Sequence, residues 1–414
     1  MSLTDQLLGQ LASNLDACFG RNIPANLGVA VSGGSDSLAL LHLACIWARA
    51  NEVKLWAITV DHNLRENSAD EAALVAKWCQ ELGVAHDTRV WHDWDRDGNL
   101  QDAARQARYK LINAWRGNLD YVLIGHTLDD QAETLLQRLK RGSGVDGMCG
   151  MQMMSTHETG MTLLRPLLDT KREELQAYLD NIGQSWIDDP SNENTAFDRI
   201  AMRKLLPHLQ SAGIELARFS TLASHMQRAQ GALNHYASDA AVRFCIQDGT
   251  DLVLDHGAFC DQHPETQLRV LSAALCWISG QSYRPRFDAI QRALRAVENG
   301  KVINLHGCLM YPNKNTTRIT REYAAVVDQS DPHIWDGRWK LVHPSEGYIL
   351  RALGEQGAEQ LDQTQRAQVP YRSLFAQPAI FEGDQLFYTP TLDQTQRQFV
   401  QDLRINFIDY LSPH

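Results

Sequence analysis

Short apolar runs alternate with longer stretches of helical period over the first 170 residues, and this alternation constrains the fold more than any other feature. The apolar runs are rich in valine and isoleucine and predict strands at 27–31, 54–61, 87–91 and 121–125. Residues at helical spacing predict helices at 37–50, 69–82, 99–115 and 129–140. Strands that alternate with helices form a parallel sheet with crossover helices on its faces. We therefore predict an α/β domain with a doubly wound parallel sheet.

The chain is too long for a single hydrophobic core. It has 414 residues, whereas an ordinary domain holds about 100 to 200. Alanine, leucine and glutamine recur at helical spacing from 214 to 298. Short strand-like runs then follow at 302–305, 319–325 and 385–389. We therefore predict three parts, which are the α/β domain at 1–212, a helical domain at 213–325 and a small α+β C-terminal module at 326–414.

Composition and charge exclude several classes of protein. The longest nearly uncharged apolar stretch, 38–48, is much shorter than the roughly 20 residues that a membrane helix needs. The first residues lack the basic character of a targeting peptide, so we expect a cytoplasmic protein. The eight cysteines are scattered without a C-x-x-C spacing, which favours reduced thiols over disulfides or structural zinc. A net charge of -11 argues against indiscriminate binding to nucleic acids.

A hexapeptide rich in glycine and serine follows the first predicted strand and directly precedes the first predicted helix. It consists of Ser32, Gly33, Gly34, Ser35, Asp36 and Ser37. Its glycines let the backbone approach an anion, and the amides of the turn and of the helix N-terminus point towards that anion. The pattern suits a pyrophosphate, and Asp36 is then placed to bind the Mg²⁺ that accompanies it. The hexapeptide matches neither a Walker loop nor a dinucleotide-binding motif, and a capped βα turn is the structural alternative.

Charged side chains are expected near the same edge of the predicted sheet, where ligands of open α/β folds bind. Asp130 and Glu133 follow the fourth strand and share one helix face, so they are candidates to bind Mg²⁺ or a cationic substrate. Arg105 and Arg108 lie three residues apart on the preceding helix, and a guanidinium group bonds two phosphate oxygens. Solvated acids and surface ion pairs are the structural alternatives for these four residues.

The motifs in combination resemble a known family. The hexapeptide is similar to the PP-loop of the ATP-pyrophosphatase superfamily, whose members cleave ATP between the α- and β-phosphates. Further segments resemble the tRNA(Ile)-lysidine synthetases in order and spacing, and they are 60–65, 104–109, 126–134, 140–144, 165–168 and 186–192, followed by Arg199 and Arg203. The resemblance is dense over the first half of the chain.

The resemblance implies a ligase that joins free lysine to carbon 2 of the wobble cytidine in the minor isoleucine tRNA with a CAU anticodon. ATP, accompanied by Mg²⁺, would adenylate the base, and the amine of lysine would then displace AMP to give lysidine. The implied ATP-binding residues are Ser32, Gly33, Gly34, Ser35, Asp36, Ser37, His62, Arg105 and His126. A purely structural role is the alternative for the two histidines.

The same resemblance implies catalytic roles for Asp36, Arg108, Asp130 and Glu133, with Asp36 and Asp130 as the Mg²⁺ ligands. For Asp130 and Glu133 three roles stay open, namely metal binding, placement of lysine and removal of a proton from its amine. The family's later domains contact tRNA, and a basic window at 284–321 holds eight basic and two acidic residues. The predicted tRNA-binding residues are Arg199, Arg203, Arg284, Arg286, Arg318 and Arg321, and a solvated basic face is the alternative for the window.

Two other functions are weighed against the ligase. A tRNA thiolase generally carries cysteines in C-x-x-C arrangements, and this sequence has none. A nucleotide-binding or tRNA-binding protein without catalysis would keep the glycine-rich loop but lose its acidic and arginine partners, and both kinds of partner are present here. The sequence favours an amine over sulfur as the nucleophile, and it leaves the oligomeric state open.

Overall fold

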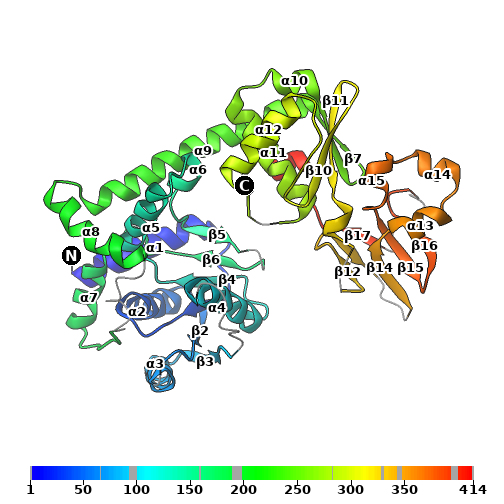
Figure 1. The fold of residues 1–414 in the computed structure, drawn as a ribbon. Coiled ribbons are helices and arrows are strands. Elements are labelled where there is room, and N and C mark those ends of the chain that lie inside the picture. Colours follow the sequence, from blue (N-terminus) through cyan, green and yellow to red (C-terminus); the bar gives the residue numbers. More distant parts are fainter. Residues whose placement is uncertain are drawn as a thin grey trace. The chain divides into compact units, whose positions relative to one another are not determined.

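The computed structural model describes residues 2–65, 67–92, 100–157, 160–188, 198–281, 283–327, 331–342, 347–392 and 400–412. The chain forms two compact units, Met1–Gln230 and Gly231–His414 (Figure 1). The division into three domains at residues 212 and 325 stays a prediction. Within the described residues, no helix is both long enough and apolar enough to span a membrane.

The first unit alternates strands and helices as the sequence predicts. Its first half comprises α1 (Leu3–Phe19), β1 (Asn26–Ala30), α2 (Ser35–Ala50), β2 (Lys54–Asp61), α3 (Ser68–Glu81), β3 (Ala85–Val90), α4 (Leu100–Arg116) and β4 (Tyr121–Ile124). Its second half comprises α5 (Leu128–Lys140), α6 (Val145–Met148), β5 (Met154–Thr156), β6 (Thr162–Leu164), α7 (Arg172–Asn181), α8 (Asp198–Ser211) and α9 (Leu216–Phe244), which continues into the second unit.

The strands of this unit form one sheet in the order β3-β2-β1-β4-β6-β5 (Figure 1). β1 pairs in parallel with both β2 and β4, and β3 and β6 extend the parallel sheet on either side. β5 runs antiparallel to β6 at one edge. Strand order reverses between β1 and β4, and in sheets of this kind ligands bind beyond the carboxyl ends of the strands at such a reversal. The segments that follow β1 and β4 are therefore the expected binding site.

Apolar side chains on both faces of the sheet hold the helices in place. On one face, Leu11 of α1, Leu41 of α2 and Leu175 of α7 belong to the same buried cluster as Leu27 and Val29 of β1. On the other face, Tyr109 and Ile112 of α4 pack with Ile58, Val122 and Leu163. α2 is apolar around most of its circumference, as expected for a helix buried on nearly all sides. The predicted doubly wound sheet is therefore confirmed.

The second unit combines antiparallel sheets with helices. A five-stranded sheet has the order β7-β8-β11-β10-β9, and two three-stranded sheets have the orders β12-β13-β17 and β14-β15-β16. The strands of the large sheet are β7 (Cys245–Asp248), β8 (Asp251–Asp255), β9 (Ile303–Leu305), β10 (Cys308–Asn313) and β11 (Thr316–Arg321). Those of the smaller sheets are β12 (Ile334–Trp335), β13 (Trp339–Leu341), β14 (Tyr348–Ala352), β15 (Pro378–Glu382), β16 (Gln385–Tyr388) and β17 (Val400–Asp402).

Helices cover these sheets, and one part of the sequence prediction fails here. The longer helices are α11 (Pro264–Ser279) and α12 (Phe287–Glu298), and the shorter ones are α10 (His256–Cys260), α13 (Gly354–Gln360), α14 (Gln363–Ala367), α15 (Tyr371–Leu374) and α16 (Phe407–Leu411), with a 3₁₀ turn at Tyr323–Ala325. The helical interpretation of 214–298 is wrong for β7 and β8, which form an antiparallel hairpin. Gly249 and Thr250 form its two-residue turn, and glycine suits the first turn position because its φ there is 60°.

Candidate active site

The glycine- and serine-rich hexapeptide connects β1 to α2 through a tight turn. Gly33 has a φ of 88°, and a Cβ atom there would lie 2.6 Å from Cδ1 of Ile187. The Ile187 amide donates a hydrogen bond of 2.9 Å to the Gly33 carbonyl, so the segment around residue 187 lies against the turn. Only glycine fits this position, because both the backbone angle and the neighbouring side chain exclude a Cβ.

The Ser37 hydroxyl holds the turn in shape. It accepts a hydrogen bond of 3.1 Å from the Ser32 amide and donates one of 3.1 Å to the Gly34 carbonyl. α2 begins at Ser35 with Gly34 as its N-cap, and the first amides of a helix have no acceptor within the helix. Together with the helix dipole, these amides form a site for an anion, which we call the phosphate cradle (residues 32–37).

Three carboxylates from two helices meet one guanidinium group beside the cradle. Arg172, the first residue of α7, donates from Nε to Oδ2 of Asp36 at 2.8 Å and from Nη2 to Oδ1 of Asp130 at 3.2 Å. Its Nη1 lies 3.8 Å from Oε1 of Glu133. The side chain of Glu133 is fully buried, and that of Asp130 is 8% exposed. The structure therefore brings Asp36 of α2 together with Asp130 and Glu133 of α5, which lie far from it in the sequence. We call these three residues with Arg172 the acidic cluster.

Arg172 was not among the residues predicted from the sequence. It lies in the first turn of α7, where the helix dipole disfavours a positive charge. A cation at that position implies an acidic partner elsewhere in the fold, and this is the signal that was available in the sequence.

Several of the acidic groups also stabilise the local structure. Oδ2 of Asp130 accepts from the Thr127 amide at 2.8 Å and completes a capping box at the start of α5. Oδ2 of Asp129 accepts from the Arg172 amide at 2.8 Å, which joins the start of α7 to the start of α5. Arg203 of α8 donates from Nε to Oε1 of Glu133 at 2.8 Å. The cluster is therefore held by four helices.

Burial and charge act in opposite directions on the acidic cluster. Burial raises the pKa of Asp36, and Arg172 partly offsets this effect while the neighbouring Asp130 adds to it. Burial alone would lower the pKa of Arg172, but Asp36, Asp130 and Glu133 raise its pKa overall. The guanidinium group therefore stays charged and compensates the carboxylates in a partly desolvated site.

The donor atoms at this site are compatible with Mg²⁺ that arrives with a nucleotide. Mg²⁺ prefers oxygen ligands and usually takes one or two carboxylates together with phosphate oxygens and water. Asp36 supplies such a carboxylate next to the cradle, and Asp130 supplies a second one on the same guanidinium group. Within the described residues, no group of three or more histidine, cysteine, aspartate or glutamate side chains is arranged to hold a metal ion.

The residues predicted at the ends of β2 and β4 lie around the same edge of the sheet. His62 follows β2, and its Nε2 lies 3.4 Å from Nη2 of Arg108. The pKa of His62 is lowered to about 4, chiefly by burial and also by the nearby Arg108, while Asp61 opposes the shift. His62 is therefore a neutral imidazole at physiological pH. His126 follows β4, and its Nδ1 accepts from Nε of Arg165 at 3.2 Å. Arg105 lies one turn before Tyr109 on α4, with its guanidinium carbon 5.1 Å from the ring centroid.

The residues predicted to contact tRNA fall into different environments. Arg318 is buried and pairs with Asp248 and Asp251, and Arg321 is buried and pairs with Asp336. These pairs stabilise the second unit, and burial argues against direct contact with a phosphate. Arg284 and Arg286 are exposed. Arg203 contacts Glu133, and Arg199 lies in α8 but its side chain is outside the described residues. A role of any of these residues in binding tRNA stays a prediction.

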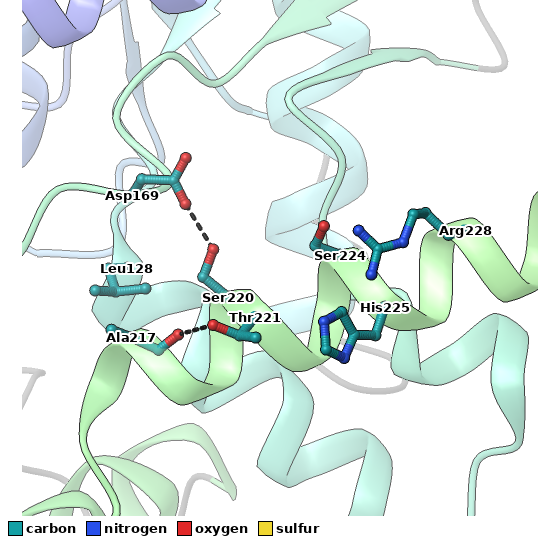
Figure 2. A pocket seen from close by; sticks show the side chains of 8 residues that line it. All are labelled: Leu128, Asp169, Ala217, Ser220, Thr221, Ser224, His225 and Arg228. Carbon is teal, nitrogen blue, oxygen red and sulfur yellow. Dashed lines mark hydrogen bonds between the residues drawn. The ribbon is translucent and has the colours of Figure 1, made fainter.

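A groove of about 410 Å³ lies along α9, beside the loop that leads into α7 (Figure 2). It is lined by Leu128, Asp169, Ala217, Ser220, Thr221, Ser224, His225 and Arg228. The Ser220 hydroxyl donates to Oδ1 of Asp169 at 2.6 Å, and the figure shows this bond crossing from α9 to the loop. Because Asp169 lies three residues before Arg172, the bond helps to fix the loop that positions the acidic cluster.

Comparison with known proteins identifies the class of domain that the first unit contains. Residues 7–209 match the family model of the PP-loop domain. The tRNA(Ile)-lysidine synthase of Ruegeria pomeroyi is 41% identical over 386 residues, which cover 92% of this chain and 92% of that protein. The tRNA(Ile)-lysidine synthase of Wolbachia pipientis is 34% identical and covers 81% of this chain and 80% of its own length. The chain belongs to the tRNA(Ile)-lysidine synthase family.

Proposed function

We propose that the protein is an ATP-dependent ligase that joins free lysine to carbon 2 of the wobble cytidine in the isoleucine tRNA with a CAU anticodon. The named relatives support this proposal across nearly the whole chain. The observation that carries it is the acidic cluster beside the phosphate cradle. There Arg172 donates hydrogen bonds to Asp36 of α2 and to Asp130 of α5. An anion site next to a site for a cation suits a reaction that joins a nucleotide to an amine.

The first step is the attack of the cytidine O2 on the α-phosphorus of ATP. A bond forms between O2 and phosphorus, and the bond to the bridging oxygen breaks, so that pyrophosphate leaves. The amides at 33–37 would bind the leaving pyrophosphate. Arg108 would stabilise charge on the phosphates, and the neutral His62 beside it would add a hydrogen bond without competing charge. Mg²⁺, held by Asp36 with Asp130, would supply further neutralisation of phosphate charge when bound.

The second step forms the carbon–nitrogen bond. The lysine amine attacks carbon 2, the bond from carbon 2 to O2 breaks, and AMP leaves with that oxygen. The amine must first lose a proton, because an ammonium group has no lone pair, and a carboxylate of the acidic cluster, Asp130 or Glu133, would accept it. We assign the binding of the incoming ammonium group to Glu133 and Asp130, since their buried carboxylates form the negative side of the cluster.

The sulfur-transferring alternative has less support. Cys45, Cys79, Cys149, Cys245, Cys276 and Cys308 are buried, and burial raises the pKa of Cys79 and Cys245 to about 12. A thiol with such a pKa is a poor nucleophile because the thiolate is the reactive form. We place the reaction in the cytoplasm, where tRNA is modified.

The proposed function is tested with ATP, radiolabelled lysine and total bacterial tRNA. We expect label to enter one isoacceptor in an amount that depends on ATP, with one AMP and one pyrophosphate released for each lysine. Omission of ATP and replacement of lysine by labelled arginine are the controls. Incorporation of sulfur, or ATP cleavage without incorporation of lysine, would contradict the proposal.

Reversal of the charges at Arg284 and Arg286 should weaken tRNA binding. Both side chains are exposed near the start of α12, and the neighbouring Tyr283 and Phe287 are 66% and 62% exposed. Each lost phosphate contact should flatten the dependence of log K on log salt by about 0.7 to 0.9. Filter binding between about 50 and 200 mM salt measures the slope. Equal slopes for the variant and the unmodified protein would remove these arginines from the tRNA interface.

A further inference from the structure

A second pocket of about 350 Å³ lies between α4 and the β5–β6 hairpin. Arg105 and Lys110 of α4 line it, and Arg165 lies opposite them. Arg165 is buried, whereas Arg105 and Lys110 are exposed. The three cations therefore extend from the interior of the pocket to its rim.

Among the residues that the structure describes, these cations lack acidic partners. In the part of the chain that the structure describes, no carboxylate forms an ion pair with Arg105, Lys110 or Arg165. Burial lowers the pKa of Arg138 on α5, and the neighbouring Arg105 and Arg141 lower it further. An assembly of like charges destabilises the fold unless an anion binds there. Because the chain has a net charge of -11, a local excess of cations at this pocket points to an anionic ligand.

The remaining walls of the pocket suit a nucleotide. The rings of Tyr109 and His157 lie against each other, with centroids 4.7 Å apart and planes inclined by 33°. Ser155 lines the same pocket and accepts from Nη1 of Arg165 at 2.9 Å. Tyr109 is buried and contacts both His157 and Arg105, whereas His157 is half-buried. A partly exposed imidazole ring can contact a nucleobase, while hydroxyl and guanidinium groups contact phosphate and ribose.

The pocket adjoins the phosphate cradle but is built from other residues. Arg165 donates to His126 at 3.2 Å. Gly125, the residue before His126, lies so close to the cradle that a Cβ atom there would be 2.9 Å from the carbonyl oxygen of Asp36. A ligand in the pocket would therefore lie next to a nucleotide bound in the cradle, and no cradle residue lines the pocket.

We propose that this cationic pocket binds a phosphate and its nucleotide from the tRNA strand next to the modified cytidine. The inference rests on the proposed function. A strand of RNA is favoured over a second contact to ATP because Arg105 and Lys110 reach the exposed rim, where a polyanion that remains mostly outside the protein is accessible. The pocket thereby positions the target base over the cradle.

The test is Lys110→Glu, because this side chain is exposed and its replacement removes no buried contact. We expect the Kd for tRNA to rise about tenfold and the salt slope to flatten by about 1. The Kd for a non-hydrolysable ATP analogue should stay unchanged. Thr156→Glu, at another exposed position of the pocket, should weaken tRNA binding in the same direction. Lys77→Glu on α3 is the matched control, since Lys77 is 68% exposed and does not line the pocket, and it should change neither Kd.

Two results would overturn the inference. If Lys110→Glu weakens the ATP analogue and leaves tRNA unaffected, the pocket serves the phosphates of ATP. If both Lys110→Glu and Thr156→Glu bind tRNA as the control does, the pocket does not contact RNA. These affinities are measured without turnover. Failure of lysine incorporation in the unmodified protein would therefore contradict the proposed function. The comparison of tRNA affinities would still decide whether the pocket contacts RNA.

Discussion

Replacement of Arg172 by alanine should lower both turnover and stability. Arg172 is the cation that contacts Asp36, Asp130 and Glu133 together. Removing it leaves three carboxylates close to one another in a partly buried site, and loss of one partner of a buried ion pair costs about 3–5 kcal/mol of unfolding free energy. Misplacement of Asp36 beside the cradle should reduce turnover by about 100-fold. Urea denaturation and the lysine-incorporation assay measure the two effects.

The loss of stability should depend on pH, with a sign that follows from Asp36. Burial already raises the pKa of this carboxyl above its ordinary value of 3.8, and Arg172 is the largest opposing influence. Without Arg172 the pKa rises further in the folded protein, so the folded state binds this proton more tightly than the unfolded state does. The penalty is therefore present above the folded-state pKa and disappears as pH falls below 3.8. The stability gap between the variant and the unmodified protein should narrow from about pH 7 to about pH 4 in magnesium-free buffer.

Arg172→Lys is the matched variant. Lysine keeps the positive charge, but its single ammonium group lacks the planar fork that bonds two carboxylates at once. We expect it to recover most of the stability and little of the turnover. If Arg172→Ala unfolds at the same urea concentration as the unmodified protein at about pH 7, Arg172 does not compensate the acidic cluster.

The parts of the site that depend on local pattern were predictable from the sequence. The spacing of apolar residues predicted β1, β2 and β4 and the helices after them. A strand of a parallel sheet is buried on both faces, so its sequence is a continuous apolar run. The paired glycines marked the cradle, since Gly33 adopts a φ of 88° that other residues avoid. The topology then brought Asp36 and Asp130 to one edge, as the reversal of strand order requires.

The pairing of charges was not predictable in the same way. Arg172 and Asp36 are separated by 136 positions, and only the packing of α7 beside α2 brings them together. Arg318 was interpreted as a tRNA contact because it lies in a basic window. Its partners, Asp248 and Asp251, belong to the β7–β8 hairpin, which the sequence analysis had assigned to a helical segment. An error in the local structure thus also concealed the partner of the arginine.

Gly125→Ala should disable the site without changing a single charged group. An alanine Cβ would lie 2.9 Å from the carbonyl oxygen of Asp36 and 2.9 Å from Cα of Ser37. Both atoms belong to the backbone of the cradle, so no side-chain rotation relieves the contact. Either the end of β4 or the start of α2 must shift, at a cost of about 1–3 kcal/mol. Displacement of the cradle amides by a fraction of an ångström to an ångström should lower turnover by about 100-fold.

The matched control is Gly9→Ala, because Gly9 is an exposed glycine inside α1 with no atom within 4 Å of the added Cβ. Alanine is the better helix former there, so this variant should be more stable by about 0.5–1 kcal/mol and fully active. In Gly125→Ala we expect the Kd for the ATP analogue to rise while tRNA binding persists, because the disturbed backbone belongs to the cradle. Undiminished ATP affinity and turnover in Gly125→Ala would mean that the turn at 32–37 does not hold the phosphates, and the assignment of the active site would fail with it.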